Sequence, residues 1–275
     1  MPADLVDAAD GLIADDVGEQ VQRKHDLLQR YISISSAARK MYLGRGKAGA
    51  TFIDLFSGAG RCRVRESNVW KDGSALVAWK QSLASGSPFS QIHIADIREE
   101  ARNACVDRLL KNNAPVKAVV GNAVQAADQL IEALNPAGLH LVFLDPYNLR
   151  ALDFRIFETL AKLKRVDLIV HVSAMDLQRN LDKNIFATDS DFDYFCPGWR
   201  DVIDANSGQF DTRSQIIEFW KSRVAELGVG ASTQMKLITG TGGQRLYWLL
   251  IAAKHELAKK LWKVAANTDG QTELF

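Results

Sequence analysis

Three adjacent residues at the end of an apolar run offer the sharpest chemistry in the sequence. Asp145, Pro146 and Tyr147 follow the apolar residues 141–144. The Asp145 carboxylate and the Pro146 carbonyl can accept hydrogen bonds from an amine and so point its lone pair at an incoming methyl carbon. Tyr147 can stack on a planar base. We therefore predict that these residues form a catalytic site that acts on an amine. The alternative is a structural role, in which Asp-Pro ends a strand and the tyrosine packs against the protein.

A glycine-containing turn follows another short apolar run. Residues 51–56 read as a buried strand, with Asp54 inside it and Gly58 and Gly60 just beyond it. Glycine lets the backbone turn sharply and approach a ligand closely. A dinucleotide fingerprint would need a third glycine where Arg63 stands, and residues 46–48 lack the Ser or Thr of a phosphate loop. The pattern is instead typical of a site for S-adenosylmethionine, whose cationic sulfonium end needs no phosphate cradle; a plain turn is the alternative.

Polar residues at the ends of the next two predicted strands extend this cofactor site. Asp96 ends the run 92–96 and can accept hydrogen bonds from ribose hydroxyls. Asn122 follows the run 116–120 and can hydrogen-bond an adenine edge, although either residue can also serve as a helix cap. The predicted cofactor contacts are Asp54, Phe56, Ser57, Gly58, Gly60, Asp96, Ile97, Asn122 and Ala123.

Three arginines alternate directly after the glycine turn. Alternation would place Arg61, Arg63 and Arg65 on one side of an extended segment near the cofactor. Such a cluster suits the phosphates of a substrate, so we predict that these arginines bind substrate. Ordinary surface charge, paired with the nearby Glu66 and Asp72, is the alternative.

The segments that must position these residues alternate between strands and helices. Strands are predicted at 51–56, 92–96, 116–120, 139–144 and 166–172, with helices at 99–110, 123–134 and 154–163 between them. This alternation predicts a parallel sheet with helices on both faces. A glycine-rich turn between 234–238 and 245–253 predicts a terminal hairpin. The fold class is therefore α/β: a Rossmann-like sheet of about seven strands, a C-terminal antiparallel hairpin and an N-terminal helical extension.

The distribution of charge divides the chain further. Residues 1–20 carry six acidic residues and no Lys or Arg, which predicts an acidic flexible tail. Residues 21–275 are predicted to form a single domain. Within it, the polar, aromatic-containing segment 176–214 breaks the alternation, so we predict an irregular insertion. Its aromatic residues would either pack on one another or form a lid over a substrate.

Composition excludes several classes of protein. A net charge of +1 does not by itself indicate a nucleic-acid binder. The three cysteines are far apart and have no metal-ligand spacing, so we predict no metal site and a reducing compartment. No signal peptide is recognisable, and the longest apolar runs are far shorter than the roughly 20 residues that a membrane helix needs. These features predict a cytoplasmic protein that does not enter a membrane.

The chain as a whole resembles the three-Cys-motif partner proteins, and its Asp-Pro-Tyr site is similar to that of nucleic-acid amino-methyltransferases, which reads Asp/Asn-Pro-Pro-Tyr/Phe. The resemblance covers most of residues 21–265. It rests on KHDLL (24–28), IDLFSGAGR (53–61), GSAL (73–76), FLDPY (143–147) and LYWLLIAAKH (246–255).

This resemblance implies a class I methyltransferase-like fold, S-adenosylmethionine as cofactor and a partner protein that bears a three-cysteine motif. The first hypothesis is a methyltransferase that acts on an amine of a nucleic-acid base, in DNA or RNA, together with that partner. The alternative is a weakly active or inactive methyltransferase-fold binding partner, because Tyr147 stands where a second proline is usual and Asn122 stands where an acid is more usual. A small-molecule methyltransferase is the third hypothesis.

Overall fold

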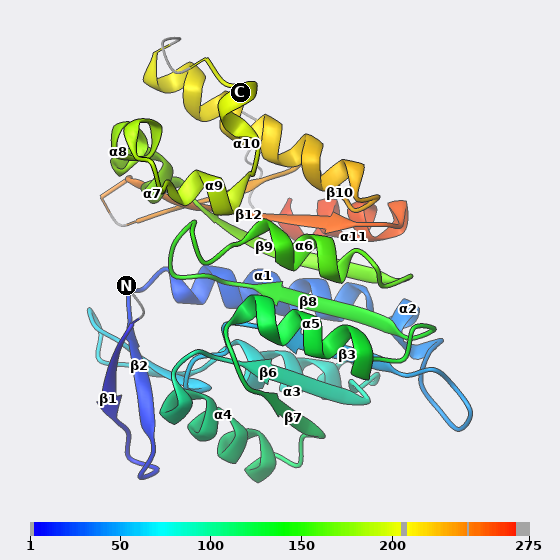
Figure 1. The fold of residues 1–275 in the computed structure, drawn as a ribbon. Helices are drawn as coiled ribbons and strands as arrows, with labels where there is room; N and C mark the ends of the chain where they lie inside the picture. Colours follow the sequence, from blue (N-terminus) through cyan, green and yellow to red (C-terminus); the bar gives the residue numbers. More distant parts are fainter. Residues whose placement is uncertain (1–2, 205–207, 241, 268–275) are drawn as a thin grey trace.

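A mixed β-sheet forms the centre of the protein (Figure 1), in a computed structural model that describes residues 3–204, 208–240 and 242–267. Five neighbouring strands, which extend to one edge of the sheet, are parallel, and the strand next to them, near the C-terminus of the chain, runs antiparallel. Both β10 and β11 pair with that antiparallel strand, β12. The spatial order is β10 (Gly230–Ala231), β12 (Arg245–Ala253), β9 (Val166–Ser173), β8 (Leu139–Leu144), β3 (Ala50–Asp54), β6 (Gln91–Ala95) and β7 (Val116–Val119), with β11 (Lys236–Thr239) beside β12.

Helices cover both faces of this sheet (Figure 1). Because successive strand residues point to opposite faces, Phe52 packs in the core on one side and Ile53 in the core on the other. The first core includes α1 (Val21–Ile34), α3 (Ser74–Ala84), α4 (Glu99–Lys111) and α11 (Glu256–Ala266). The second includes α5 (Ala123–Ala133), α6 (Phe154–Leu160) and α10 (Gln209–Glu226); the short α2 (Ser36–Lys40) follows α1.

The predicted fold class is confirmed. The buried runs at 139–144 and 245–253 form strands with the expected bounds, and the other predicted strands differ by at most two residues at either end. The helix α5 begins where Asn122 accepts the backbone N–H of Gln125, whose side chain accepts the N–H of Asn122 in return. This capping box explains why the helix starts at that residue.

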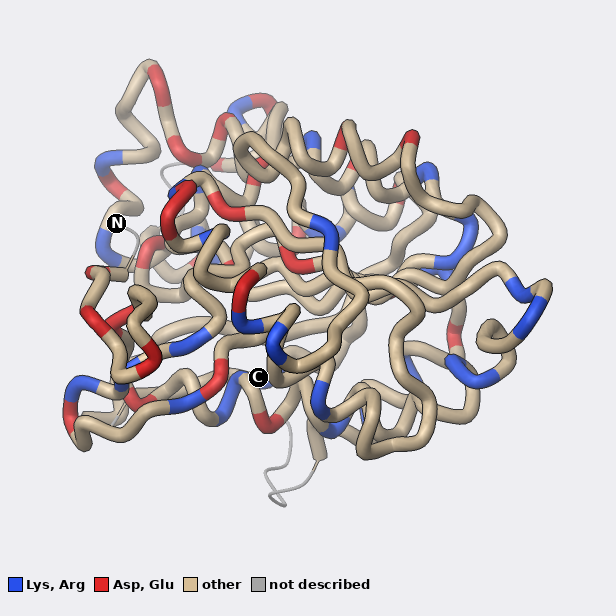
Figure 2. Tube along the Cα trace, turned by 90° about the horizontal axis from the view of Figure 1, so that it is seen from below, with Lys and Arg blue, Asp and Glu red and all other residues tan. Residues whose placement is uncertain are grey.

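The predicted acidic tail is wrong for the described part of residues 1–20. Two strands there form a hairpin, which joins a second sheet in the order β1 (Asp4–Asp7), β2 (Ile13–Val17), β4 (Arg61–Val64), β5 (Trp70–Asp72). Three of the six acids, Asp10, Asp15 and Asp16, pair with arginines from elsewhere in the chain: Asp10 contacts Arg108 at 2.8 Å, and Asp15 contacts Arg98 at 3.0 Å. Lys/Arg and Asp/Glu segments are interspersed around the N-terminus in Figure 2. Distant arginines therefore neutralise this stretch, which the local sequence alone does not show.

Short helices make up most of the described part of segment 176–214, so the predicted irregular insertion is also wrong; residues 205–207 lie outside the described residues. Several of its aromatic residues are buried: Phe195 stacks on Trp220 of α10 with 5.3 Å between ring centroids, and Phe192 meets Trp199 edge-on at 5.5 Å. The short elements are α7 (Ala174–Arg179), α8 (Leu181–Phe186), α9 (Asp191–Phe195) and the 3₁₀ turn η1 (Trp199–Asp201).

Two observations concern the described residues alone. None of their helices combines the length and the apolar character needed to cross a membrane. In the same residues, no group of three or more His, Cys, Asp or Glu side chains is arranged to hold a metal ion.

Candidate functional site

A cavity of about 610 Å³ opens at the carboxyl ends of the parallel strands. Ligands of open α/β sheets bind at this edge, because the loops that follow parallel strands converge there. The loop after β3 contributes Gly58, the end of β6 contributes Asp96, and the end of β8 contributes Asp145. The structure thus brings together residues of both predicted halves, the cofactor site and the catalytic site.

The glycine turn is held by backbone contacts on both sides. Ser57 donates its N–H to the carbonyl of Ala95 at 3.0 Å, and Gly58 donates to the Asp96 carboxylate at 2.9 Å. Ala59 donates to the carboxylate of Asp15 at 2.7 Å. Gly58 has φ of +57°, and a Cβ there would lie 2.3 Å from Asp15 Oδ2. A glycine is therefore required at this position, and the close neighbour is a side chain of the N-terminal hairpin.

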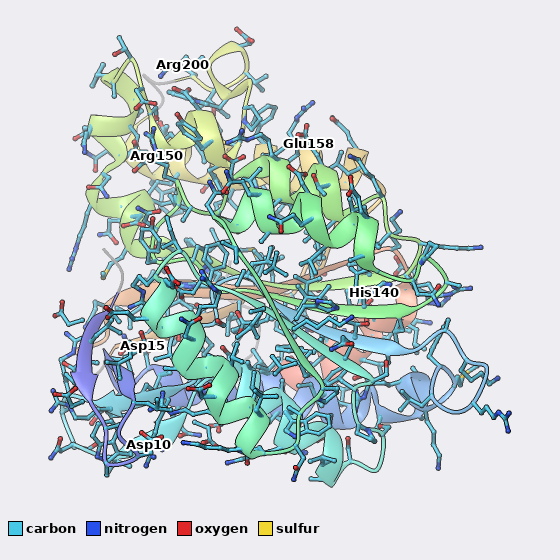
Figure 3. The ribbon with its side chains drawn as sticks, turned by 60° about the horizontal axis from the view of Figure 1, so that its bottom comes forward. Asp10, Asp15, His140, Arg150, Glu158 and Arg200 are labelled. Atoms are coloured by element: carbon cyan, nitrogen blue, oxygen red, sulfur yellow. The ribbon has the colours of Figure 1, made fainter. Side chains whose placement is uncertain are left out.

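Asp15 is the unexpected member of the site. It comes from β2, and Figure 3 labels it together with Asp10 on the N-terminal hairpin. Burial raises the pKa of its carboxyl, although the N–H of Ala59 and the guanidinium of Arg98 oppose this effect. Arg98 also contacts Asp96 at 3.1 Å. The arginine thus lies between two carboxylates beside the glycine turn.

Two predicted cofactor contacts lie behind the turn and not on the cavity wall. Asp54 is fully buried, accepts the Ser74 hydroxyl at 2.5 Å and accepts the N–H of Phe56 at 3.1 Å. Burial raises the pKa of this carboxyl to about 7. A Cβ on Gly60 would meet Cys105 Sγ at 2.9 Å, so this glycine allows close packing against α4. Both residues shape the turn from the protein side.

The remaining predicted cofactor residues line the cavity. Asp96 directly follows β6 next to the glycine turn, and Ile97 beside it is 61% exposed. Phe56, Ser57, Asn122 and Ala123 also line the cavity. The side-chain oxygen of Asn122 caps α5, which is the alternative to the predicted contact with adenine. Among the predicted cofactor residues, the exposed, apolar Ile97 therefore offers the clearest surface for the adenine ring.

Asp145 lies in a cluster of charged and aromatic side chains. One carboxylate oxygen, Oδ2, accepts the Lys24 ammonium of α1, and the other, Oδ1, lies 2.7 Å from Nδ1 of His171 on β9. The ring of Tyr247 on β12 meets His171 edge-on, with 4.1 Å between centroids. The Lys24 Nζ lies 5.8 Å from the same tyrosine ring. Both oxygens of Asp145 are therefore engaged by the chain itself.

Electrostatics fix the charge state of this cluster. Desolvation alone would raise the pKa of the Asp145 carboxyl, but Lys24 and His171 overcome it and hold that pKa well below its usual range. Burial lowers the pKa of His171, against the opposing effect of Asp145. Burial, reinforced by Asp145, raises the pKa of the Tyr247 hydroxyl far above its ordinary value. Near neutral pH the cluster therefore contains an ionised Asp145 and a neutral His171.

The other two residues of the predicted catalytic triplet lie at the cavity wall. Pro146 follows Asp145 there, and Tyr147 is 44% exposed. An exposed aromatic ring at a cavity is free to stack on a planar group of a ligand. Its position is compatible with the stacking role considered from the sequence.

The three arginines alternate as expected but have acidic partners. Arg61 contacts Asp10 at 3.4 Å, and both Arg63 and Arg65 contact Asp16, at 2.9 and 3.3 Å. Of the three, Arg65 lines the cavity. The hairpin carboxylates thus neutralise much of the charge that was predicted to meet phosphate, which weakens the predicted substrate role of Arg61 and Arg63.

The helices after β9 form one wall of the cavity. Tyr194 of α9 and Asp176 of α7 line it. Arg150, labelled in Figure 3, lies 4.0 Å from the Tyr194 ring and pairs with Asp189 at 2.9 Å. These contacts attach the segment after β9 to the loop that follows Asp145.

Four side chains of this site were not among the predicted site residues: Asp15, Lys24, His171 and Tyr247. Lys24 and Tyr247 lie in segments that carry the family resemblance, KHDLL and LYWLLIAAKH, but no role was attached to either. His171 ends a predicted strand, which was a usable signal. Asp15 gave none, because only the docking of the hairpin brings it to the glycine turn.

No family model matches the sequence, and no curated protein sequence matches it either. Among solved structures, the chain is similar to a Legionella pneumophila protein of family DUF519, at 10% identity and a TM-score of 0.55, covering 91% of each chain. It is also similar to an O-methyltransferase from Bacillus cereus in complex with SAH, at 16% identity and a TM-score of 0.52, covering 90% of this chain and 87% of that chain. These similarities show a Rossmann-like, methyltransferase-like fold. The resemblance to three-Cys-motif partner proteins stays a prediction.

Proposed function

We propose that the chain is an S-adenosylmethionine-dependent methyltransferase whose cofactor lies in the part of the cavity next to the glycine turn. The observation that carries the proposal is the convergence of Gly58, Asp96 and Asp145 on one cavity at the carboxyl ends of β3, β6 and β8. The similar fold of the Bacillus cereus O-methyltransferase, described in complex with SAH, supports this choice of cofactor.

The residues present fit this cofactor. The cavity volume is in the range of small-molecule and cofactor sites, about 300–1,000 Å³. Ile97 offers an exposed apolar surface for the adenine, and the Asp96 carboxylate stands beside it to accept a ribose hydroxyl. Asp15 brings a negative charge to the glycine turn, where the amino group of the methionine part could meet it.

When bound, the cofactor would supply an electrophilic methyl group. The chain would orient the acceptor with the side chains around Asp145. Tyr147, exposed at the cavity wall, supports an acceptor with a planar base and hence the nucleic-acid substrate proposed from the sequence. An amine acceptor held by Asp145 would share that carboxylate with Lys24 and His171, which each contact one of its oxygens.

The same engagement favours a second candidate function. A chain whose acceptor-binding carboxylate is paired with its own lysine could serve as a weakly active or inactive binding partner of a three-cysteine-motif protein. The two candidates differ in turnover, not in cofactor binding. A methyltransferase transfers label from a radiolabelled cofactor to an acceptor, whereas a binding partner only forms a complex.

Calorimetric titration with SAH tests the proposed cofactor site. We expect the parent chain to bind SAH and Ile97→Asp to weaken binding at least about tenfold, because a buried charge would face the adenine. Val120→Asp is the matched control, since Val120 is 65% exposed and does not line the cavity. No binding by the parent chain, or equal effects of the two variants, would contradict the assignment.

A further inference from the structure

The hydrogen bond between His171 and Asp145 defines which nitrogen of the imidazole carries the proton. His171 Nδ1 lies 2.7 Å from Asp145 Oδ1, while Lys24 contacts the other carboxylate oxygen. An ionised carboxylate only accepts hydrogen bonds, so Nδ1 must be the donor. In the neutral ring, the lone pair is then on Nε2.

This second nitrogen is available to a ligand. His171 lines the cavity, its side chain is 13% exposed, and no described residue forms a hydrogen bond with Nε2. The Tyr247 hydroxyl is not its partner, because that group donates to the carbonyl of Gln20 at 3.0 Å. An oriented imidazole with one nitrogen held by a carboxylate and the other open to a cavity has the geometry of a general base.

The charged groups around the ring keep it neutral and fixed. Asp145 directly after β8, Lys24 of α1 and Asp176 of α7 are the charged groups that act on His171, and Tyr247 of β12 meets its ring edge-on. The Lys24 cation and burial favour the neutral ring, whereas the two carboxylates favour the protonated ring. The pKa of His171 is lowered as a net result, so the ring can accept a proton at neutral pH.

We propose that His171 is the general base of this site and that the acceptor is a hydroxyl group; this inference rests on the proposed methyltransferase function. A hydroxyl oxygen is a weak nucleophile until its proton is removed, and one open nitrogen acceptor is enough to bind it. An exocyclic amine would have to share the Asp145 carboxylate with Lys24 and His171, whereas no described residue competes for Nε2 of His171. In the transfer, the acceptor oxygen forms a bond to the methyl carbon while the carbon–sulfur bond breaks and its electron pair stays on sulfur. The hydroxyl proton moves to Nε2, and Asp145 stabilises the resulting imidazolium.

Nitrogen-15 NMR of the histidine side chains, on the whole chain without ligand, tests the base directly. We expect His171 to carry its proton on Nδ1 at pH 7 and to titrate below the ordinary histidine pKa. Lys24→Met removes the cation and should raise the pKa of His171 by roughly 1 unit or more. Lys80→Met is the control, because Lys80 pairs with Asp72 outside the cavity and should leave the pKa unchanged. A proton on Nε2 of His171, or an unchanged pKa of His171 in Lys24→Met, would overturn the assignment of His171 as the general base.

A labelling experiment tests the acceptor. Bulk RNA offers both ribose hydroxyls and base amines to the enzyme in one molecule. With cofactor that carries a tritiated methyl group, nuclease digestion should place the label on oxygen. His171→Gln should reduce the transfer by about 10²–10⁴-fold and keep the SAH affinity of the parent. Label on nitrogen, or undiminished transfer by His171→Gln, overturns the inference but not the proposed function. Absence of SAH binding by the parent chain overturns both.

Discussion

Replacing Gly58 by alanine should cost far more stability than replacing a glycine in a similar backbone conformation elsewhere. Gly58 has φ of +57°, and the added Cβ would lie 2.3 Å from Asp15 Oδ2. Gly86 has φ of +67°, and a Cβ there would meet nothing within 4 Å. Gly86→Ala therefore introduces only the left-handed backbone strain, about 1–2 kcal/mol.

The larger effect at Gly58 comes from the displaced carboxylate. Asp15 accepts the N–H of Ala59 at 2.7 Å and pairs with Arg98 at 3.0 Å, so it cannot move without losing a charge-assisted contact. Such a contact contributes about 1.5–3 kcal/mol. Together with the backbone strain, Gly58→Ala should lower the free energy of unfolding by about 2.5–5 kcal/mol.

Urea denaturation of a double-mutant cycle separates the two effects. In an Asp15→Ala background the contact is already lost, so adding Gly58→Ala should cost only about 1–2 kcal/mol more. If Gly58→Ala and Gly86→Ala destabilise the parent chain equally, or if Asp15→Ala does not reduce the effect of Gly58→Ala, then the hairpin carboxylate does not lie against the glycine turn in solution.

Three further outcomes are expected. The pKa of Asp54 is raised by burial from 3.8 to about 7, so its carboxyl holds a proton in the folded chain that it loses in the unfolded chain over that interval. This group should make the free energy of unfolding fall as the pH rises through the interval, and Asp54→Asn should make the slope less steep in urea titrations. Asp10→Asn removes the charge partner of the buried Arg108 and should make the N-terminal hairpin more sensitive to limited proteolysis. The control variant Asp211→Asn, at an exposed residue, should not change this sensitivity. Trp220→Ala should lower the free energy of unfolding by about 3–5 kcal/mol because Trp220 is fully buried. Phe210 lies on the same helix and is 67% exposed, so Phe210→Ala should change the free energy of unfolding by less than about 0.5 kcal/mol. Equal losses in the two variants would contradict the packing of α10.

Local patterns in the sequence determined the main sheet and the place of the cavity. Apolar runs such as 139–144 and 245–253 are too short for most helices and end in glycine, proline or charge, so they predict strands with useful accuracy. Parallel strands put their carboxyl ends at one edge, and this rule alone placed Asp96 and Asp145 at the same cavity.

The same reasoning failed where a residue's environment comes from distant parts of the chain. The acids of residues 1–20 indicate a solvated tail only if no basic partner exists, and their partners Arg98 and Arg108 follow about eighty or more positions later. Likewise, the segment after β9 reads as polar and irregular because its few buried aromatics, such as Phe195, find their partner on α10.

The chemistry of the site was decided by tertiary structure for the same reason. The sequence identified Asp145 as a hydrogen-bond acceptor for a ligand. Only the packing of α1 and β9 against β8 shows that Lys24 and His171 already use its two oxygens. The two residues that contact this carboxylate lie 121 and 26 positions away in the chain. Separations of this size carry no periodic signal, so the pairing that orients His171 is determined by the fold.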